Sequence, residues 1–179
     1  MIKALSTFLK YVFALGIAVV LIAIIARELL FVGPIKPVVE LPTTPIIDMH
    51  VHIAGLGYGD SGCFISDELK DSYKFDYYIN SFGVTEQEIK DHGDQIVIQR
   101  VAETMAASQH VAGGIVLAMD GIINEAGDLD RDKTQVYIPN DYVAEQTALY
   151  PELYFGASIN PYRKDALERL ERVKRQGAK

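Results

Sequence analysis

Two histidines one residue apart give this sequence its most distinctive chemical pattern. His50 and His52 stand in the stretch IIDMHVHI, residues 46–53, and Asp48 precedes the first of them by two positions. On a strand these three side chains would share a face, and the two imidazoles, about 7 Å apart at their Cα atoms, could converge on one ion. Neutral imidazole is the commonest ligand of zinc and similar divalent metals. The pattern predicts one edge of a metal site at His50 and His52, with Asp48 holding a histidine ring in orientation.

The alternative is a strand that carries two histidines on a polar face and binds no metal, because a His-x-His pattern alone has many false positives. His92 and His110 are expected to lie outside the site, the first near a helix end and the second before a strand. Asp120 directly follows an apolar run, where it could contact a substrate or hold a loop. Cys63, the only cysteine, is expected to be a packing residue and not a nucleophile.

The elements that must position these residues alternate along the chain. Three short apolar runs, residues 46–53, 113–120 and 153–160, predict strands. Helices are predicted from a Thr85–Glu88 capping box, from Asp94, from Asn140 up to Pro151, and from Asn160 with Pro161 up to Gly177. The last helix is expected to bury Leu167, Leu170 and Val173. Strands that look buried on both faces and alternate with helices predict an α/β fold with a parallel sheet.

The N-terminus carries a long apolar run at residues 11–26. It predicts a membrane anchor over residues 1–32, with a transmembrane helix at about 11–32. Lys3 and Lys10 precede the run, so the positive-inside rule predicts a cytoplasmic N-terminus and a domain on the extracytoplasmic side. The alternative is a signal peptide cleaved near Ala26, which would leave the domain secreted. Residues 33–45 hold four prolines and predict an extended linker to a domain over residues 46–179.

The amino-acid composition limits the classes of partner that the chain could bind. The 179 residues carry a formal net charge of −7 and no basic stripe, which argues against binding to nucleic acid. A single cysteine excludes an intramolecular disulfide. The expected partners are a small-molecule substrate and the membrane, and a homo-oligomer would cover the open edge of a short parallel sheet.

An apolar strand that ends in Asp-x-His-x-His after a proline-rich entry resembles the first barrel strand of the metal-dependent amidohydrolase superfamily. The stretch IPNDYVAEQTALYPELYFGASINPYRKDALERLERVKRQGAK, residues 138–179, is similar to the amidohydrolase-related branch, which includes hydrolases and nonoxidative decarboxylases of aromatic acids. The resemblance covers residues 45–62 and 110–179. Residues 64–92 do not match, and they are interpreted as an insertion after the first strand.

The resemblance implies a (β/α)₈ barrel with its metal at the carboxyl ends of the strands. It implies that His50 and His52 are metal ligands, and that further ligands come from the fifth, sixth and eighth strands. The metal would be zinc, with manganese or iron as alternatives. In the hydrolases of this family a metal-bound water is the nucleophile.

A full barrel needs about 250 residues, whereas residues 46–179 hold about three βα units, which predicts an incomplete (β/α)₈ barrel. The leading hypothesis is the N-terminal part of a membrane-anchored, metal-dependent hydrolase, with negligible turnover for this chain alone. One alternative is a decarboxylase of the same superfamily, and another is an inactive anchored interaction module. A third is a small metal-binding membrane protein in which Asp48 or Asp60 completes a weak site.

Overall fold

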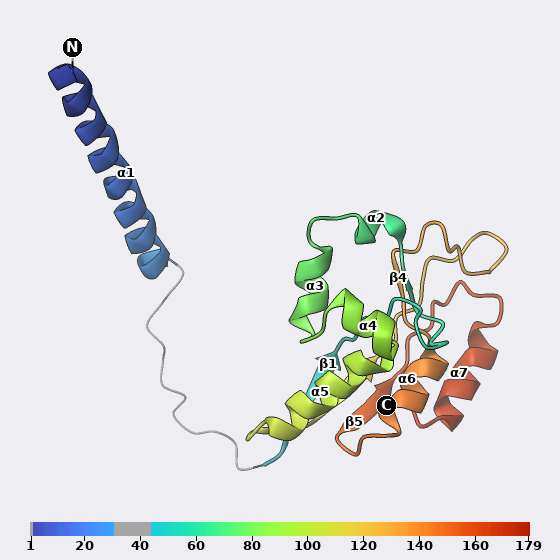
Figure 1. Cartoon of the computed structure of the whole chain (residues 1–179). Helices are drawn as coiled ribbons and strands as arrows, with labels where there is room; N and C mark the ends of the chain where they lie inside the picture. Colours follow the sequence, from blue (N-terminus) through green and yellow to red (C-terminus); the bar gives the residue numbers. More distant parts are fainter. Residues whose placement is uncertain (1, 31–43) are drawn as a thin grey trace. The chain divides into compact units, whose positions relative to one another are not determined.

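The computed structural model describes residues 2–30 and 44–179, and the side chains of residues 7–27 and 44–179. The chain forms two compact units, residues 1–41 and 42–179. Figure 1 shows the elements of both, coloured along the sequence. The predicted linker, residues 33–45, lies outside the described residues except for Thr44 and Pro45.

The first unit contains one long helix, α1 (Ile2–Leu30). Its segment Thr7–Arg27 is 21 residues long and none of it is buried. At 1.5 Å per residue it spans about 31 Å, which matches the hydrocarbon core of a bilayer at about 30 Å. Within the part of the chain that the structure describes, this is the one helix with the length and composition to cross a membrane, and a signal sequence near the N-terminus has the same character.

The second unit is built on a three-stranded parallel sheet with the order β1 (Ile46–Val51), β3 (Val111–Leu117), β5 (Leu153–Gly156). Helix α5 (Gln95–Ala107) leads from β1 to β3, and α6 (Asn140–Thr147) leads from β3 to β5. Helix α7 (Ala166–Arg175) follows β5. The predicted α/β fold with three parallel strands is therefore confirmed.

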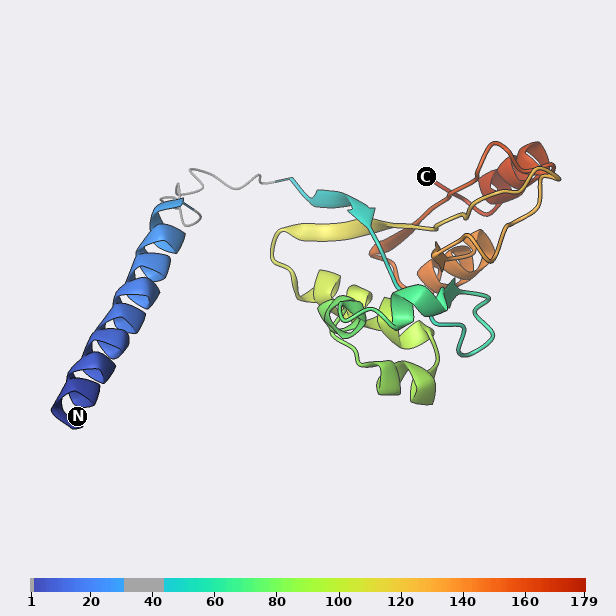
Figure 2. The same cartoon turned by 90° about the horizontal axis from the view of Figure 1, so that it is seen from above.

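Helices α5 and α6 pack on the same face of the sheet (Figure 2). Their apolar side chains meet the strand residues Val116 and Phe155, which are 0% and 4% exposed. Gly114 allows α5 to approach closely, since a Cβ at this position would lie 2.6 Å from Cε of Met105. The main core of the second unit therefore lies between the sheet and these two helices.

The opposite face of the sheet is more open, which corrects the prediction of strands buried on both faces. Ile115 and Leu117 are only half-buried there, and Tyr154 is exposed. Strand β1 is exposed over most of its length, and its Met49 is 66% exposed. The apolar composition of β1 did not reveal this, because β1 lies at the edge of the sheet with α5 over one face only.

The unmatched segment 64–92 folds into short elements around the sheet. Strand β2 (Phe64–Ile65) pairs in antiparallel fashion with β4 (Val136–Tyr137), a strand that the sequence analysis did not predict. Three short helices follow β2: α2 (Asp67–Lys70), α3 (Phe75–Ser81) and α4 (Glu86–His92). The capping box predicted for α4 is confirmed, because Thr85 and Glu88 bond reciprocally at its first turn.

Asp94 occupies the N-cap position of α5, as predicted, but its side chain does not cap that helix. The fully buried carboxylate accepts the backbone N–H groups of Leu56 and Gly57, each at 2.9 Å, and the hydroxyl of Ser61. These donors belong to the glycine-rich loop that follows β1. Asp94 therefore fixes the path of the chain directly after the histidine pair.

Helix α7 differs from the prediction at its start and on its inner face. Residues 161–165 form turns, so Asn160 is not the N-cap, which falls at Asp165. Val173 is buried, but Leu167 and Leu170 are 79% and 55% exposed. Residues three apart on a helix differ by about 60° in direction, so these three span about 120° and only one end of the stripe faces the core.

The end of α7 is as predicted. Gly177 adopts a φ of 86°, and the N–H groups of Gly177 and Ala178 bond to the carbonyls of Lys174 and Val173. This pair of bonds is the Schellman motif. The N–H of Lys179 then donates to the carbonyl of Phe155 at 2.9 Å, so the backbone returns to the free edge of β5.

Candidate metal centre

The structure brings His50 and His52 together at the carboxyl end of β1. Their Nε2 atoms lie 2.8 Å apart, and the rings are nearly perpendicular with centroids 4.6 Å apart. Both residues are exposed. The predicted convergence of the two imidazoles is therefore present, through the ring nitrogens that point away from the backbone.

Asp48 does not contact either ring. Its carboxylate accepts the backbone N–H of His50 at 2.9 Å, at the point where the pairing of β1 with β3 shifts register between Asp48 and Val51. The shift interrupts the two-residue alternation on which the sequence prediction relied. Asp48 lines a surface hollow together with Val51 of β1 and Met105 of α5, whereas the two histidine rings contact each other. Asp48 therefore holds the backbone of His50 through a hydrogen bond.

The protonation of the pair follows from its contact. With the nitrogens 2.8 Å apart, one Nε2 carries the hydrogen and donates it to the other. Partial burial and the neighbouring His50 lower the pKa of His52, which favours its neutral form. Neutral imidazole is the form that binds a metal.

The geometry fits half of a metal site. Two ring nitrogens on one tetrahedral zinc, each about 2.0–2.1 Å from it, are about 3.3 Å apart. The two Nε2 atoms would therefore have to separate by about half an ångström to bind the ion. Across residues 7–27 and 44–179, no group of three or more His, Cys, Asp or Glu side chains could hold a metal. The described chain thus supplies two ligands where zinc needs at least three from protein.

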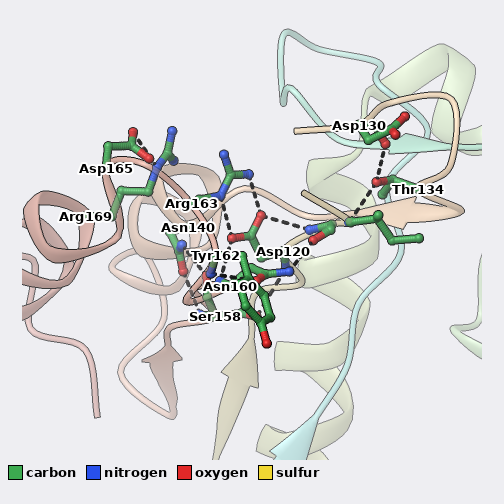
Figure 3. A network of polar contacts seen from close by, with 12 residues as sticks. Asp120, Asp130, Thr134, Asn140, Ser158, Asn160, Tyr162, Arg163, Asp165 and Arg169 are labelled. Atoms are coloured by element: carbon green, nitrogen blue, oxygen red, sulfur yellow. Dashed lines mark hydrogen bonds and ion pairs between the residues drawn. The ribbon is translucent and has the colours of Figure 1, made fainter. Parts of the chain in front are cut away.

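Asp120, at the carboxyl end of β3, lies in a separate buried network (Figure 3). Arg163 binds its carboxylate through Nε at 2.7 Å and through a terminal nitrogen at 2.5 Å. The N–H groups of Gly121 and Asn160 donate to the same carboxylate at 2.8 Å each. With four donors and a side chain 7% exposed, Asp120 joins the loops after β3 and β5. The geometry favours the loop-holding role over contact with a substrate.

Two amide side chains extend this network. Asn160 donates to the carbonyl of Gly121, and Asn140, at the start of α6, bonds both backbone polar groups of Ser158. The Ser158 hydroxyl in turn accepts the N–H of Asp120. Sequence analysis missed Arg163, which is 43 positions from its partner, and no local pattern indicates the pair.

The electrostatics of Asp120 reflect opposing effects. Burial raises the pKa of its carboxyl group, but the Arg163 guanidinium and the two backbone N–H donors outweigh burial, so its pKa lies below the ordinary value. The Asp120 carboxylate is therefore charged at neutral pH and paired with a buried cation.

The other candidates lie away from the pair. His110 precedes β3, and its carbonyl accepts the N–H of Ile46 at the opposite end of β1 from His52. His92 is exposed at the last residue of α4. Cys63 is 3% exposed, and burial raises the pKa of its thiol to about 12, as expected for a packing residue.

Comparison of the chain with protein-family models, with curated proteins and with solved structures found no match.

Proposed function

We propose that this chain carries the first metal-binding edge of an amidohydrolase-type, metal-dependent hydrolase that acts on a small organic substrate. The observation that carries the proposal is the 2.8 Å approach of the Nε2 atoms of His50 and His52 at the carboxyl end of β1. Carboxyl ends of parallel strands are where barrel enzymes place their chemistry.

The strand order supports a barrel-type arrangement. Consecutive parallel strands lie side by side in the order β1, β3, β5, and α5 and α6 cover the same face. Doubly wound folds instead reverse their strand order and cover both faces. The bond from Lys179 to Phe155 also returns the chain to the edge of β5, where a following parallel strand would lie.

In this proposal the chain's own residues bind and orient. His50 and His52 would hold the metal, and Asp48 fixes the backbone of His50. Asp94 holds the loop after the pair, and Asp120 with Arg163 holds the loops after the neighbouring strands. A bound divalent metal would supply Lewis acidity and an activated water. The remaining metal ligands would come from residues other than His50 and His52.

The proposed location is a membrane surface. Helix α1 has the length and apolar surface of a single span. The positive charges of Lys3 and Lys10 before its core support a cytoplasmic N-terminus, with residues 44–179 on the extracytoplasmic side. Release by cleavage near the end of α1 is the alternative that N-terminal sequencing of the mature protein distinguishes.

The test is the metal content of the full chain in detergent micelles, measured by elemental analysis after equilibration with zinc and removal of free ion. We expect bound zinc in the wild type and its loss in a His50→Ala/His52→Ala double variant. A His92→Ala/His110→Ala variant removes the same number of imidazoles and should keep the metal. Equal zinc in all three proteins, or none in the wild type, would overturn the proposal.

A further inference from the structure

Helix α3 presents uncharged aromatic side chains to the solvent. Phe75 and Ile79, which are 6% and 2% exposed, form the inner side of this helix. At about 100° per residue, Tyr77 lies opposite to them, and it is 74% exposed. The neighbouring Tyr78 is 49% exposed, and Tyr73, just before the helix, is 89% exposed. The outer side of a surface helix usually carries charged and polar residues, so this group of tyrosines calls for a partner.

The three residues Tyr73, Tyr77 and Tyr78, called here the tyrosine surface, have hydroxyl groups that are free to bind a partner. None of these hydroxyls makes a hydrogen bond to a described residue. The rings of Tyr77 and Tyr78 meet edge to face with centroids 5.9 Å apart, and Nζ of Lys74 lies 5.6 Å from the ring centroid of Tyr73. A tyrosine of this kind suits a boundary between an apolar and an aqueous phase, because its ring enters one and its hydroxyl stays in the other.

The membrane that α1 is proposed to cross is such a boundary. Residues 31–43 connect α1 to the second unit, and a chain of this length spans at most about 45 Å. The second unit therefore stays close to the lipid surface and meets it at a high effective concentration. Tyrosine is enriched at membrane–water interfaces, where its ring lies at the level of the lipid headgroups.

The charges near the tyrosine surface determine which lipids it suits. Residues 67–76 carry four carboxylates and two ammonium groups, a net charge of −2, from Asp67, Glu68, Asp71, Asp76, Lys70 and Lys74. The whole chain carries −7. Anionic headgroups would repel these carboxylates, whereas zwitterionic headgroups carry no net charge. A contact made by tyrosine rings with zwitterionic lipid should also be insensitive to salt.

We propose that the tyrosine surface lies in the zwitterionic headgroup region of the bilayer that holds α1, as a second and peripheral membrane contact of this chain. The inference depends on the proposed membrane location of α1 and is independent of the metal site. The surface belongs to residues 64–92, the segment outside the amidohydrolase resemblance, and it involves no edge of the sheet. This contact would determine which side of the second unit faces the membrane.

The first experiment uses the absence of tryptophan from the chain, because one substitution then adds a unique fluorescent reporter. The full chain is reconstituted through α1 into phosphatidylcholine vesicles, with or without bromine on the acyl chains as a short-range quencher. We expect Tyr77→Trp to lose emission in brominated vesicles and to emit at a shorter wavelength than tryptophan in water. Tyr162→Trp is the matched control, because Tyr162 is 82% exposed and lies before α7, and its emission should not change.

An Ile17→Trp variant reports whether α1 is inserted. Ile17 lies in the middle of the segment Thr7–Arg27, so its reporter should be strongly quenched. An unquenched reporter at position 17 would overturn the membrane location and this inference together. Quenching at position 17 without quenching at 77, or equal quenching at 77 and 162, would overturn this inference alone. A shift to shorter wavelength at position 77 without quenching would also overturn it, because the tyrosine surface would then contact protein instead of lipid.

The second experiment tests which groups make the contact. In the Tyr77→Trp background, Tyr73→Ser should weaken quenching, whereas Tyr162→Ser, at a similarly exposed position, should leave it unchanged. Phosphatidylglycerol added to the vesicles should reduce quenching, and about 0.5 M salt should have little effect in phosphatidylcholine alone. Quenching that grows with phosphatidylglycerol and disappears with salt would overturn the proposal, because Lys70 and Lys74 would then make the contact.

Discussion

The guanidinium of Arg163 and the carboxylate of Asp120 form a two-bond ion pair, at 2.7 and 2.5 Å, with side chains only 5% and 7% exposed. The pair joins the loop after β3 to the loop after β5, across 43 residues of sequence. It lies at the carboxyl ends of these strands, the same end of the sheet as His52. The loops around the candidate site are therefore held by a buried charge pair.

Replacing Asp120 with alanine should strongly destabilise the second unit. The change leaves Arg163 buried without its counter-charge, and breaking a buried pair in this way costs about 3–5 kcal/mol. Urea unfolding of the full chain in micelles, followed by near-UV circular dichroism of the tyrosines, measures the loss.

Asp128→Ala is the control for this change. Lys164 and Asp128 form an ion pair at 2.6 Å, but their side chains are 62% and 51% exposed. Exposed pairs contribute about 0–1 kcal/mol. If the two variants lost similar free energies of unfolding, the buried pair would not stabilise the loops as argued.

Acid should remove the contribution of Asp120. Its pKa is lower in the folded state than the unfolded value of about 3.9, so the unfolded chain binds more protons between the two values and stability rises with pH there. The contribution is complete above the unfolded pKa and is lost as the pH falls through the folded pKa. The difference in unfolding free energy between wild type and Asp120→Asn should stay constant from about pH 7 to 5 and narrow below about pH 4. A difference that widens in acid would contradict this assignment.

Sequence reasoning predicted the three strands and the approach of the two histidines because both depend on local patterns. Short apolar runs mark β1, β3 and β5, and the spacing of His50 and His52 places both rings on one side. The predictions failed where contacts between residues distant in the sequence determine the direction or the exposure of a side chain. The direction of Asp48 depends on the register of β1 against β3, and the exposure of Met49 depends on the position of β1 at the sheet edge.

The roles of buried polar residues were equally beyond local patterns. Asp94 has the sequence context of a helix cap, but the loop after β1 supplies three donors that take its carboxylate. Asn160 before Pro161 also looks like a cap, yet its backbone N–H binds Asp120 and its side chain binds the carbonyl of Gly121. In both cases the tertiary partners lie 33 to 40 residues away in the sequence.

The bond from Asp48 to the backbone of His50 should tune metal affinity. Asp48→Ala removes the acceptor that fixes His50, and loss of such supporting contacts weakens metal binding by about 10-fold or more. Asp48→Asn keeps an acceptor oxygen and should bind zinc with nearly the affinity of the wild type. Competition with a chromophoric chelator measures all three. Unchanged affinity in Asp48→Ala would show that the contact does not orient the pair.

Cys63 should be unreactive in the folded chain and should report its unfolding. It is the only cysteine, it is 3% exposed, and its pKa of about 12 leaves about one thiolate in 10⁴ at pH 8. Alkylation with iodoacetamide, followed by mass spectrometry, should therefore be slow in buffer and rise with urea along the unfolding transition. In a Leu149→Cys variant the added thiol is exposed and should be alkylated readily without urea. Rapid alkylation of Cys63 in native buffer would contradict its burial beneath the loop that Asp94 holds.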